Sequence, residues 1–177
     1  LFYDDYCNWQ RIDEYKDFIK NSNIAKIAME LMLSKKVNLF HEHILIKEPG
    51  ATKRTPWHQD MPYWKGSSNK LSIWISLDRV TRKSGSICYI PGSHKKLYQH
   101  VKTNSYLVVR NVDEKKRVTV ETEKGDVLIH HSMILHGSVE NILRKDRYAL
   151  IFTYQPATDI SHHRTGSAKL IEHRLTN

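Results

Sequence analysis

The strongest constraint on this fold is a series of short strand-like segments that follow one another without helices between them. They are rich in β-branched and aromatic residues, and Pro-Gly or Gly-Asp pairs bound several of them. The segments are residues 37–46, 70–78, 86–90, 106–110, 118–121, 126–131 and 147–155. Strands that are joined by turns pair antiparallel, so the pattern predicts a mainly β sandwich or barrel.

The first part of the chain has a different pattern. Apolar residues at helical spacing predict two short helices between residues 9 and 33, with Asn21 and Ser22 as the stop and the new N-cap. We expect one domain over residues 1–177, with a helical entry at 1–35, a strand core at 37–156 and a polar tail at 157–177. The chain opens at Leu1 without a methionine, which suggests a trimmed or incomplete protein.

Composition limits the compartment and the partners that we expect for the protein. The chain has 177 residues, a net charge of +9 and two cysteines, which form no disulfide framework. No apolar run reaches membrane-spanning length, so we expect no membrane partner and a cytoplasmic location. The basic excess lies after residue 50 and fits an anionic small molecule. Because basic and acidic residues are interspersed, the pattern weighs against nucleic acid. The sequence carries no signal for an oligomeric state.

The tetrapeptide Trp57-His58-Gln59-Asp60 is the first candidate for chemistry. On an extended strand His58 and Asp60 would point to the same face. With one distant histidine they would form the set of two imidazoles and one carboxylate that ferrous non-haem oxygenases use. A His-x-Asp triplet is usually structural, but aromatic residues flank this one, and a cation would compensate for the burial of both groups.

Three histidines are candidates for the third ligand: His130, His131 and His136. His130 and His131 lie on opposite faces of the strand predicted at 126–131. His136 comes before Gly137 and Ser138, whose small side chains allow a bound group to approach closely. The residues alone leave the choice open.

Arg147 begins an apolar strand, where it would face either solvent or a buried anion. A salt bridge with Asp146 is the ordinary interpretation, whereas a guanidinium group also suits a carboxylate bidentately. Ser138 would add a hydrogen bond through the short connecting loop. Arg144 is the alternative arginine, but its polar neighbours indicate an exposed loop.

Several linked motifs resemble the phytanoyl-CoA dioxygenase family over about residues 40–156. They are Thr55-Pro56-Trp57-His58-Gln59-Asp60, residues 72–78, Gly85-Ser86, Ile90-Pro91-Gly92-Ser93-His94, Gly125-Asp126, His136-Gly137-Ser138, Asn141 and Arg147. The resemblance implies a double-stranded β-helix, a cupin-like jelly-roll core, which binds Fe(II) and 2-oxoglutarate and uses O2. The segment before His58 is shorter than in full-length members of the family.

The resemblance also implies residue roles. By position, the metal ligands, which are catalytic through the metal, are His58, Asp60 and His136. The residues that match the cosubstrate site are Arg147, Ser138 and Trp74. The strand before Pro49-Gly50 resembles the pocket wall of the family, so we add candidate pocket-lining residues: His41, His43, Gln59 and Lys47.

The expected function is therefore hydroxylation of a C–H bond of a small molecule by a 2-oxoglutarate-dependent dioxygenase. Related halogenases replace the carboxylate ligand with a small residue, so Asp60 favours hydroxylation. Lys53, Arg54, Lys65 and Lys70 flank the first motif and suit an anionic substrate. The alternatives are a non-catalytic jelly-roll module that binds metal or has a structural role, and, with support from charge alone, a nucleic-acid-modifying oxygenase.

Overall fold

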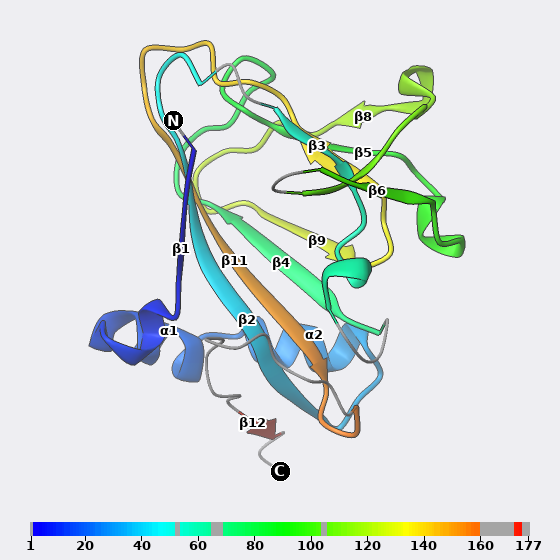
Figure 1. Cartoon of the computed structure of the whole chain (residues 1–177). Coiled ribbons are helices and arrows are strands. Elements are labelled where there is room, and N and C mark those ends of the chain that lie inside the picture. Colours follow the sequence, from blue (N-terminus) through cyan, green and yellow to red (C-terminus); the bar gives the residue numbers. More distant parts are fainter. Residues whose placement is uncertain (1, 52–53, 65–68, 104–105, 160–171, 175–177) are drawn as a thin grey trace.

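The computed structural model describes residues 2–51, 54–64, 69–103, 106–159 and 172–174. Two helices and twelve strands occur within these ranges (Figure 1). The helices are α1 (Asp13–Asn21) and α2 (Ile24–Leu31). The strands are β1 (Phe2–Tyr6), β2 (Lys36–Lys47), β3 (Thr55–His58), β4 (Leu71–Ser76), β5 (Ile87–Tyr89), β6 (His100–Lys102), β7 (Leu107–Val109), β8 (Val118–Thr119), β9 (Val127–His131), β10 (His136–Ser138), β11 (Arg147–Pro156) and β12 (Glu172–Arg174).

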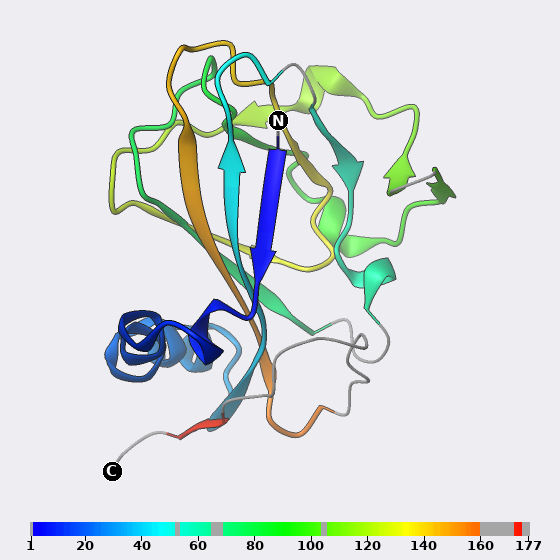
Figure 2. The same ribbon diagram turned by 60° about the vertical axis from the view of Figure 1, so that its left-hand side comes forward.

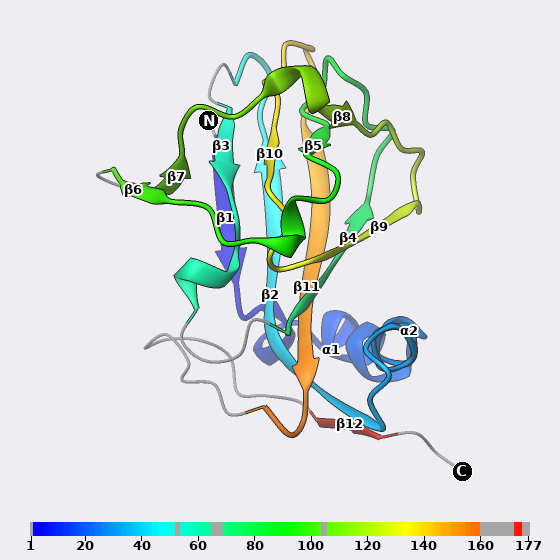
Figure 3. The same ribbon diagram turned by 90° about the vertical axis from the view of Figure 1, so that its right-hand side faces the viewer.

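The strands form two main antiparallel sheets. The larger has the order β1-β2-β11-β4-β9, with β12 also paired to β2, and the smaller has the order β3-β10-β5-β8. A separate hairpin joins β6 to β7. Figure 2 shows β1, β2 and β11 side by side, and Figure 3 shows the smaller sheet against the long strands. This is the mainly β, jelly-roll architecture that the strand pattern and the family resemblance predict.

The two helices cover the outer face of the larger sheet (Figure 1). Ile19 of α1 and Ala28 of α2 are fully buried, and they belong to one apolar cluster with Ile73, Phe152 and other sheet residues. Burying a side chain of this size contributes about 1.5–3 kcal/mol. The helices thus close the outer face and leave the inner face of the sheet for polar side chains.

The inner face of the larger sheet carries a polar row that crosses four strands. His130 of β9 pairs in register with Ser72 of β4, which pairs with Thr153 of β11, which pairs with His41 of β2. Because side chains alternate along a strand, residues that are in register across neighbouring strands share one face. This row lies on the same side of the sheet as the candidate site.

Both ends of the described chain contribute strands to the larger sheet. β1 was not among the predicted strands, yet it pairs with β2 from Phe2–Lys47 to Tyr6–His43. Much of the tail expected at 157–177 lies outside the described residues, and within it residues 172–174 form β12. No helix in the described ranges is long and apolar enough to cross a bilayer.

Candidate metal and anion site

Neighbouring strands of the smaller sheet bring together the three predicted metal ligands. His58 ends β3 and pairs in register with His136, the first residue of β10. One ligand atom each from His58, Asp60 and His136 lie within 4.8 Å of one another. Within the described part of the chain, this is the cluster of metal-ligating side chains that could hold an ion. Of the three candidate histidines, His136 is therefore the one that lies in this cluster.

Asp60 reaches this cluster by a route other than the expected one. We expected His58 and Asp60 to share one face of an extended strand, but β3 ends at His58. Asp60 instead has helical backbone angles, φ −72° and ψ −35°, and it precedes a 3-10 turn at Met61–Tyr63. Its backbone N–H donates to the carbonyl of Ser132 at 2.9 Å. The turn and this hydrogen bond, rather than strand alternation, bring the carboxylate beside the histidines.

Backbone carbonyls orient both imidazole rings. Nδ1 of His58 lies 2.8 Å from the carbonyl oxygen of Pro56, and Nδ1 of His136 lies 3.0 Å from that of Ile134. A ring that donates from Nδ1 keeps the lone pair on Nε2 for a metal. The Nε2 atoms lie 3.5 Å and 3.7 Å from Oδ1 of Asp60, respectively.

The charges of the cluster suit a divalent cation. Burial would raise the pKa of Asp60, but His136, His130 and His58 together hold it well below its usual value. Burial and the neighbouring His58 lower the pKa of His136 to about 3. At neutral pH Asp60 is therefore a carboxylate and His136 a neutral imidazole. Two nitrogens and one carboxylate oxygen are the donor set of non-haem ferrous sites, so these residues fit that metal.

A second cluster on the adjoining strand ends carries two buried cations. Arg147 begins β11 and is 2% exposed, and it pairs in register with the fully buried Lys47 of β2. Nζ of Lys47 donates to Oγ of Ser138 at 2.6 Å and to the carbonyl of Val139 at 2.5 Å. The guanidinium carbon of Arg147 lies 5.7 Å from the ring centroid of Trp74. The structure thus brings together Arg147, Ser138 and Trp74, and adds Lys47 to them.

The guanidinium group of Arg147 is only partly compensated by the described residues. Nε and Nη1 of Arg147 are buried without a hydrogen-bond partner among the described residues. Burial lowers the pKa of Arg147 to about 10. Burial and the adjacent charge of Arg147 lower the pKa of Lys47 to about 7. A buried donor without an acceptor is costly, so this cluster suits a carboxylate that occupies the vacant hydrogen-bonding capacity.

His41 and His43 lie on β2, on the face that also carries Lys47. Nδ1 of His43 forms an ion pair with Oδ1 of Asp4 at 2.6 Å, and the ring stacks on Tyr6. The ring centroid of His41 lies 4.7 Å from that of His43. Both residues are therefore on the inner face, on the same wall as the buried cations, and His43 is also the register partner of Tyr6 on β1. The rival Arg144 is exposed, as its sequence context indicates.

Gln59 has a structural position rather than a pocket-lining one. It is fully buried, its Nε2 donates to the carbonyls of Lys96 and Met133, and its Oε1 accepts from the backbone of Tyr98. Both polar atoms of its side chain therefore form hydrogen bonds to the backbone of loops around the metal cluster. Of the flanking basic residues, Lys53 and Lys65 lie outside the described residues, and Arg54 pairs with Glu140 at 2.7 Å.

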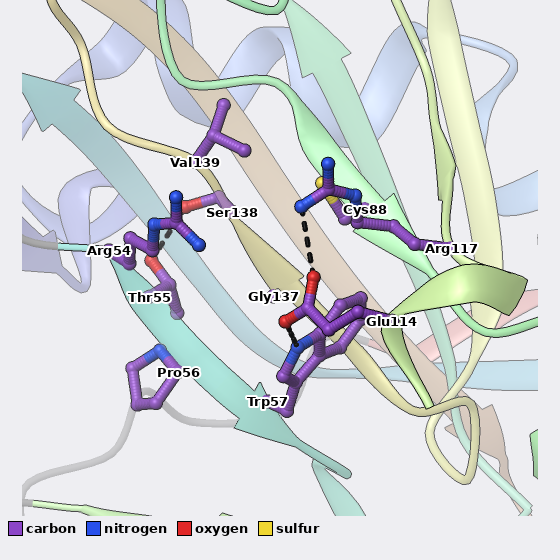
Figure 4. Close-up of a pocket in the computed structure, with 10 residues that line it drawn as sticks. All are labelled: Arg54, Thr55, Pro56, Trp57, Cys88, Glu114, Arg117, Gly137, Ser138 and Val139. Carbon is purple, nitrogen blue, oxygen red and sulfur yellow. Dashed lines mark hydrogen bonds and ion pairs between the residues drawn. The ribbon is translucent and has the colours of Figure 1, made fainter. Parts of the chain in front are cut away.

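A pocket lies beside the smaller sheet (Figure 4). Its lining includes Trp57 of β3 and Gly137 of β10, which are sequence neighbours of the ligands His58 and His136, and Cys88 of β5. Glu114 accepts from Trp57 Nε1 at 2.7 Å and from Arg117 at 3.0 Å across this pocket. None of the three candidate ligands lines it, but Ser138, which accepts from Lys47 in the anion cluster, does. The pocket therefore excludes the metal cluster and adjoins the anion cluster.

Sequence comparison gives the family. The family model for phytanoyl-CoA dioxygenase (PhyH) matches residues 2–149. The chain belongs to the phytanoyl-CoA dioxygenase family. A probable phytanoyl-CoA dioxygenase of Caenorhabditis elegans is 27% identical over 154 residues, covering 78% of this chain and 49% of that protein. The human peroxisomal phytanoyl-CoA dioxygenase is 26% identical over 157 residues, covering 80% and 46%.

The relatives of this PhyH chain also include a protein that is not named for phytanoyl-CoA. A probable alpha-ketoglutarate-dependent hypophosphite dioxygenase of Stutzerimonas stutzeri is 28% identical over 156 residues, covering 82% of this chain and 54% of that protein. The chain thus spans about half the length of the curated relatives it matches.

Solved structures confirm the fold. EvdO2 from Micromonospora carbonacea var. aurantiaca, complexed with 2-oxoglutarate, superposes with a TM-score of 0.80 at 24% identity, covering 92% of this chain and 69% of that chain. The non-haem monooxygenase ThoJ gives a TM-score of 0.83 at 18% identity, covering 98% and 66%.

Proposed function

We propose that this chain is the core of an Fe(II)- and 2-oxoglutarate-dependent dioxygenase that hydroxylates a C–H bond of a small molecule. The observation that carries the proposal is the presence of two clusters that β10 links, because it supplies His136 to one and the Lys47 partner Ser138 to the other. The first is the ligand triad of His58, Asp60 and His136, and the second contains the buried cations Lys47 and Arg147. The first suits a ferrous ion, and the second suits the far carboxylate of a dicarboxylate. Family membership supports both assignments.

The residues divide the work between them. His58, Asp60 and His136 would hold the ion, and Arg147 with Lys47 and Ser138 would bind the distal carboxylate of 2-oxoglutarate. Trp74, which is 1% exposed, packs beside the guanidinium group and excludes water from that carboxylate. Bound iron with 2-oxoglutarate and O2 supplies the oxidising chemistry. The chain itself contributes position, neutralisation of charge and a dry site.

Asp60 is the residue that favours hydroxylation within this chemistry. Its carboxylate is ionised and directed at both histidines, so it would occupy the metal position that a halide would need. Relatives of similar identity are named for phytanoyl-CoA and for hypophosphite, so we leave the substrate at the level of a small molecule. Neither cysteine forms a disulfide, which suits a reducing compartment, and we propose the cytoplasm. The human relative is named peroxisomal.

Anaerobic titration with Fe(II) and 2-oxoglutarate tests this function. We expect a visible charge-transfer band for the wild-type chain and a much weaker one at equal concentrations for Asp60→Ala, which loses the carboxylate ligand. Arg144→Met is the matched control, because Arg144 is exposed and its band should equal that of the wild type. Circular dichroism should show the same β content in all three proteins.

The outcomes separate the proposal from its alternative. A band in the wild type, followed in air by succinate formation that depends on Asp60, supports the dioxygenase. Absence of the band in the wild type would leave a non-catalytic jelly-roll module. A band of equal strength in Asp60→Ala would contradict the ligand assignment.

A further inference from the structure

The two oxygens of Asp60 face different groups. Oδ1 is directed toward the Nε2 atoms of His58 and His136. Oδ2 accepts a hydrogen bond from Oγ of Ser72 at 3.4 Å and lies 3.9 Å from Nε2 of His130. One oxygen therefore faces the candidate metal position, and the other faces the inner wall of the larger sheet.

His130 is oriented from behind by Tyr89. The hydroxyl of Tyr89 lies 3.0 Å from Nδ1 of His130. If the phenol donates to Nδ1, the imidazole carries its proton on Nε2, which is the atom directed at Oδ2 of Asp60. The side chain of His130 is only 7% exposed, so few other arrangements are open to it. The three groups then form one directed chain: the hydroxyl of Tyr89, the ring of His130 and the carboxylate of Asp60.

The series Tyr89, His130 and Asp60 connects the two sheets next to the metal ligands. Tyr89 lies on β5 of the smaller sheet and is the register partner of the ligand His136. His130 lies on β9 of the larger sheet and is the register partner of Ser72. Ser72 is held in turn by Thr153 at 3.0 Å. The hydrogen-bond donor Ser72 and the ring of His130, which both face Oδ2, are thus held by neighbouring strands.

We propose that His130, held by Tyr89, is a positioning residue that keeps Oδ2 of Asp60 away from the metal, so that the carboxylate binds through Oδ1 alone. The inference rests on the proposed function for the identity of the site. A carboxylate without a partner on its second oxygen is free to rotate and to chelate the ion with both oxygens, which would take a position that 2-oxoglutarate or O2 needs. Partners of this kind typically change metal affinity about 10–100-fold.

Titration with Co(II) alone, read by its visible d–d absorption, tests the proposal without turnover. His130→Phe keeps a ring but removes the donor, and we expect Co(II) affinity to fall about 10–100-fold with a changed band shape. His130→Gln retains an N–H donor at a similar reach, and it should recover most of the affinity and the wild-type spectrum. Tyr89→Phe removes only the orienting hydroxyl and should lower the affinity about tenfold, at the low end of the same range.

Tyr148→Phe is the matched control for the tyrosine variant. The Tyr148 hydroxyl bonds to Asp146 at the surface, so its removal should leave the Co(II) spectrum and affinity unchanged. The thermal midpoint of each metal-free protein separates positioning from packing. A positioning role leaves the midpoint of Tyr89→Phe and His130→Gln close to that of the wild type.

Three results would overturn the inference. One is wild-type Co(II) affinity and spectrum in His130→Phe. Another is a loss of Co(II) affinity that parallels a fall in the thermal midpoint of the metal-free variants and that His130→Gln fails to recover. This result would indicate a packing role. The third is Co(II) binding that survives His136→Ala but not His130→Gln, because His130 would then be a ligand. If the wild type itself binds no Co(II), the proposed metal site fails first, and this inference falls with it.

Discussion

The metal end and the anion end of this site are built on opposite electrostatic principles. At the metal end Asp60 is ionised beside two imidazoles, and each ring has its Nδ1 bonded to a backbone carbonyl. At the anion end two cations, Lys47 and Arg147, are buried side by side. The protein compensates charge within the first cluster, but it leaves part of the second uncompensated.

This difference indicates what each end requires from a ligand. The metal end is held in place by hydrogen bonds that exist before an ion arrives, so binding adds coordination to a prepared geometry. At the anion end Nε and Nη1 of Arg147 have no partner in the described part of the chain, so a carboxylate would remove an existing penalty. The anion end should therefore contribute much to cosubstrate affinity while lowering the stability of the free protein.

Arg147→Met should give the largest change and separate the two ends. Truncating one side of a buried charge-assisted pair costs about 2–5 kcal/mol. We expect the dissociation constant of 2-oxoglutarate, measured by titration of the charge-transfer band, to rise about 30-fold or more at 1.4 kcal/mol per tenfold. Co(II) affinity in the absence of 2-oxoglutarate should stay unchanged, because the ligands are untouched.

The stability of this variant provides a second measurement. Methionine fills a similar volume without a buried charge, so the thermal midpoint of the ligand-free protein should be equal or higher. A lower midpoint together with unchanged 2-oxoglutarate affinity would contradict the anion-site assignment. Arg144→Met, at the exposed rival position, should change neither quantity.

Gly137→Ala should disturb both ends, because β10 supplies His136 to one and Ser138 to the other. A Cβ at Gly137 would lie 2.7 Å from the carbonyl oxygen of Thr55 on β3. Overpacking of this kind costs about 1–3 kcal/mol. We expect a lower thermal midpoint in denaturation scans, with weaker binding of both Co(II) and 2-oxoglutarate. An effect on only one ligand would show that β10 does not couple the two ends.

The sequence predicted four of the six strands of the larger sheet, because these are runs rich in β-branched and aromatic residues. β2, β4, β9 and β11 all lie within a residue or two of their expected bounds. β3 and β10 were not predicted as strands from their composition, since they are three or four residues long and contain Pro56 and Gly137. Their pairing depends on register contacts between distant segments, which local pattern does not encode.

The candidate site was likewise predicted only in part from the sequence. His58 and Asp60 do lie together, but the turn at Asp60 and its bond to Ser132 bring them there, and strand alternation does not. Lys47 was predicted only as pocket lining, because its proximity to Arg147 comes from cross-strand register. A lysine at the end of an apolar strand is a sequence feature that indicates a buried cation. Tyr89 gave no signal of its own, since only the fold places it against His130.

The part of the pH dependence of 2-oxoglutarate binding that comes from Lys47 should give the smallest change. Burial and the charge of Arg147 lower the pKa of Lys47 to about 7 in the free protein. The cation predominates below this pKa and attracts the carboxylate, whereas the neutral amine above it does not. Affinity should therefore fall as pH rises, by up to about tenfold between about pH 6 and pH 8, where the protonated fraction falls most steeply.

Lys47→Met isolates this contribution, because methionine has a similar length and does not titrate. The variant should bind 2-oxoglutarate more weakly than the wild type at low pH and approach it at high pH, so the two curves converge. Ionisation elsewhere in the site acts on both proteins and cancels in their ratio. Parallel curves with a constant ratio would show that Lys47 keeps its proton throughout, and the anion end would then hold two permanent charges rather than one.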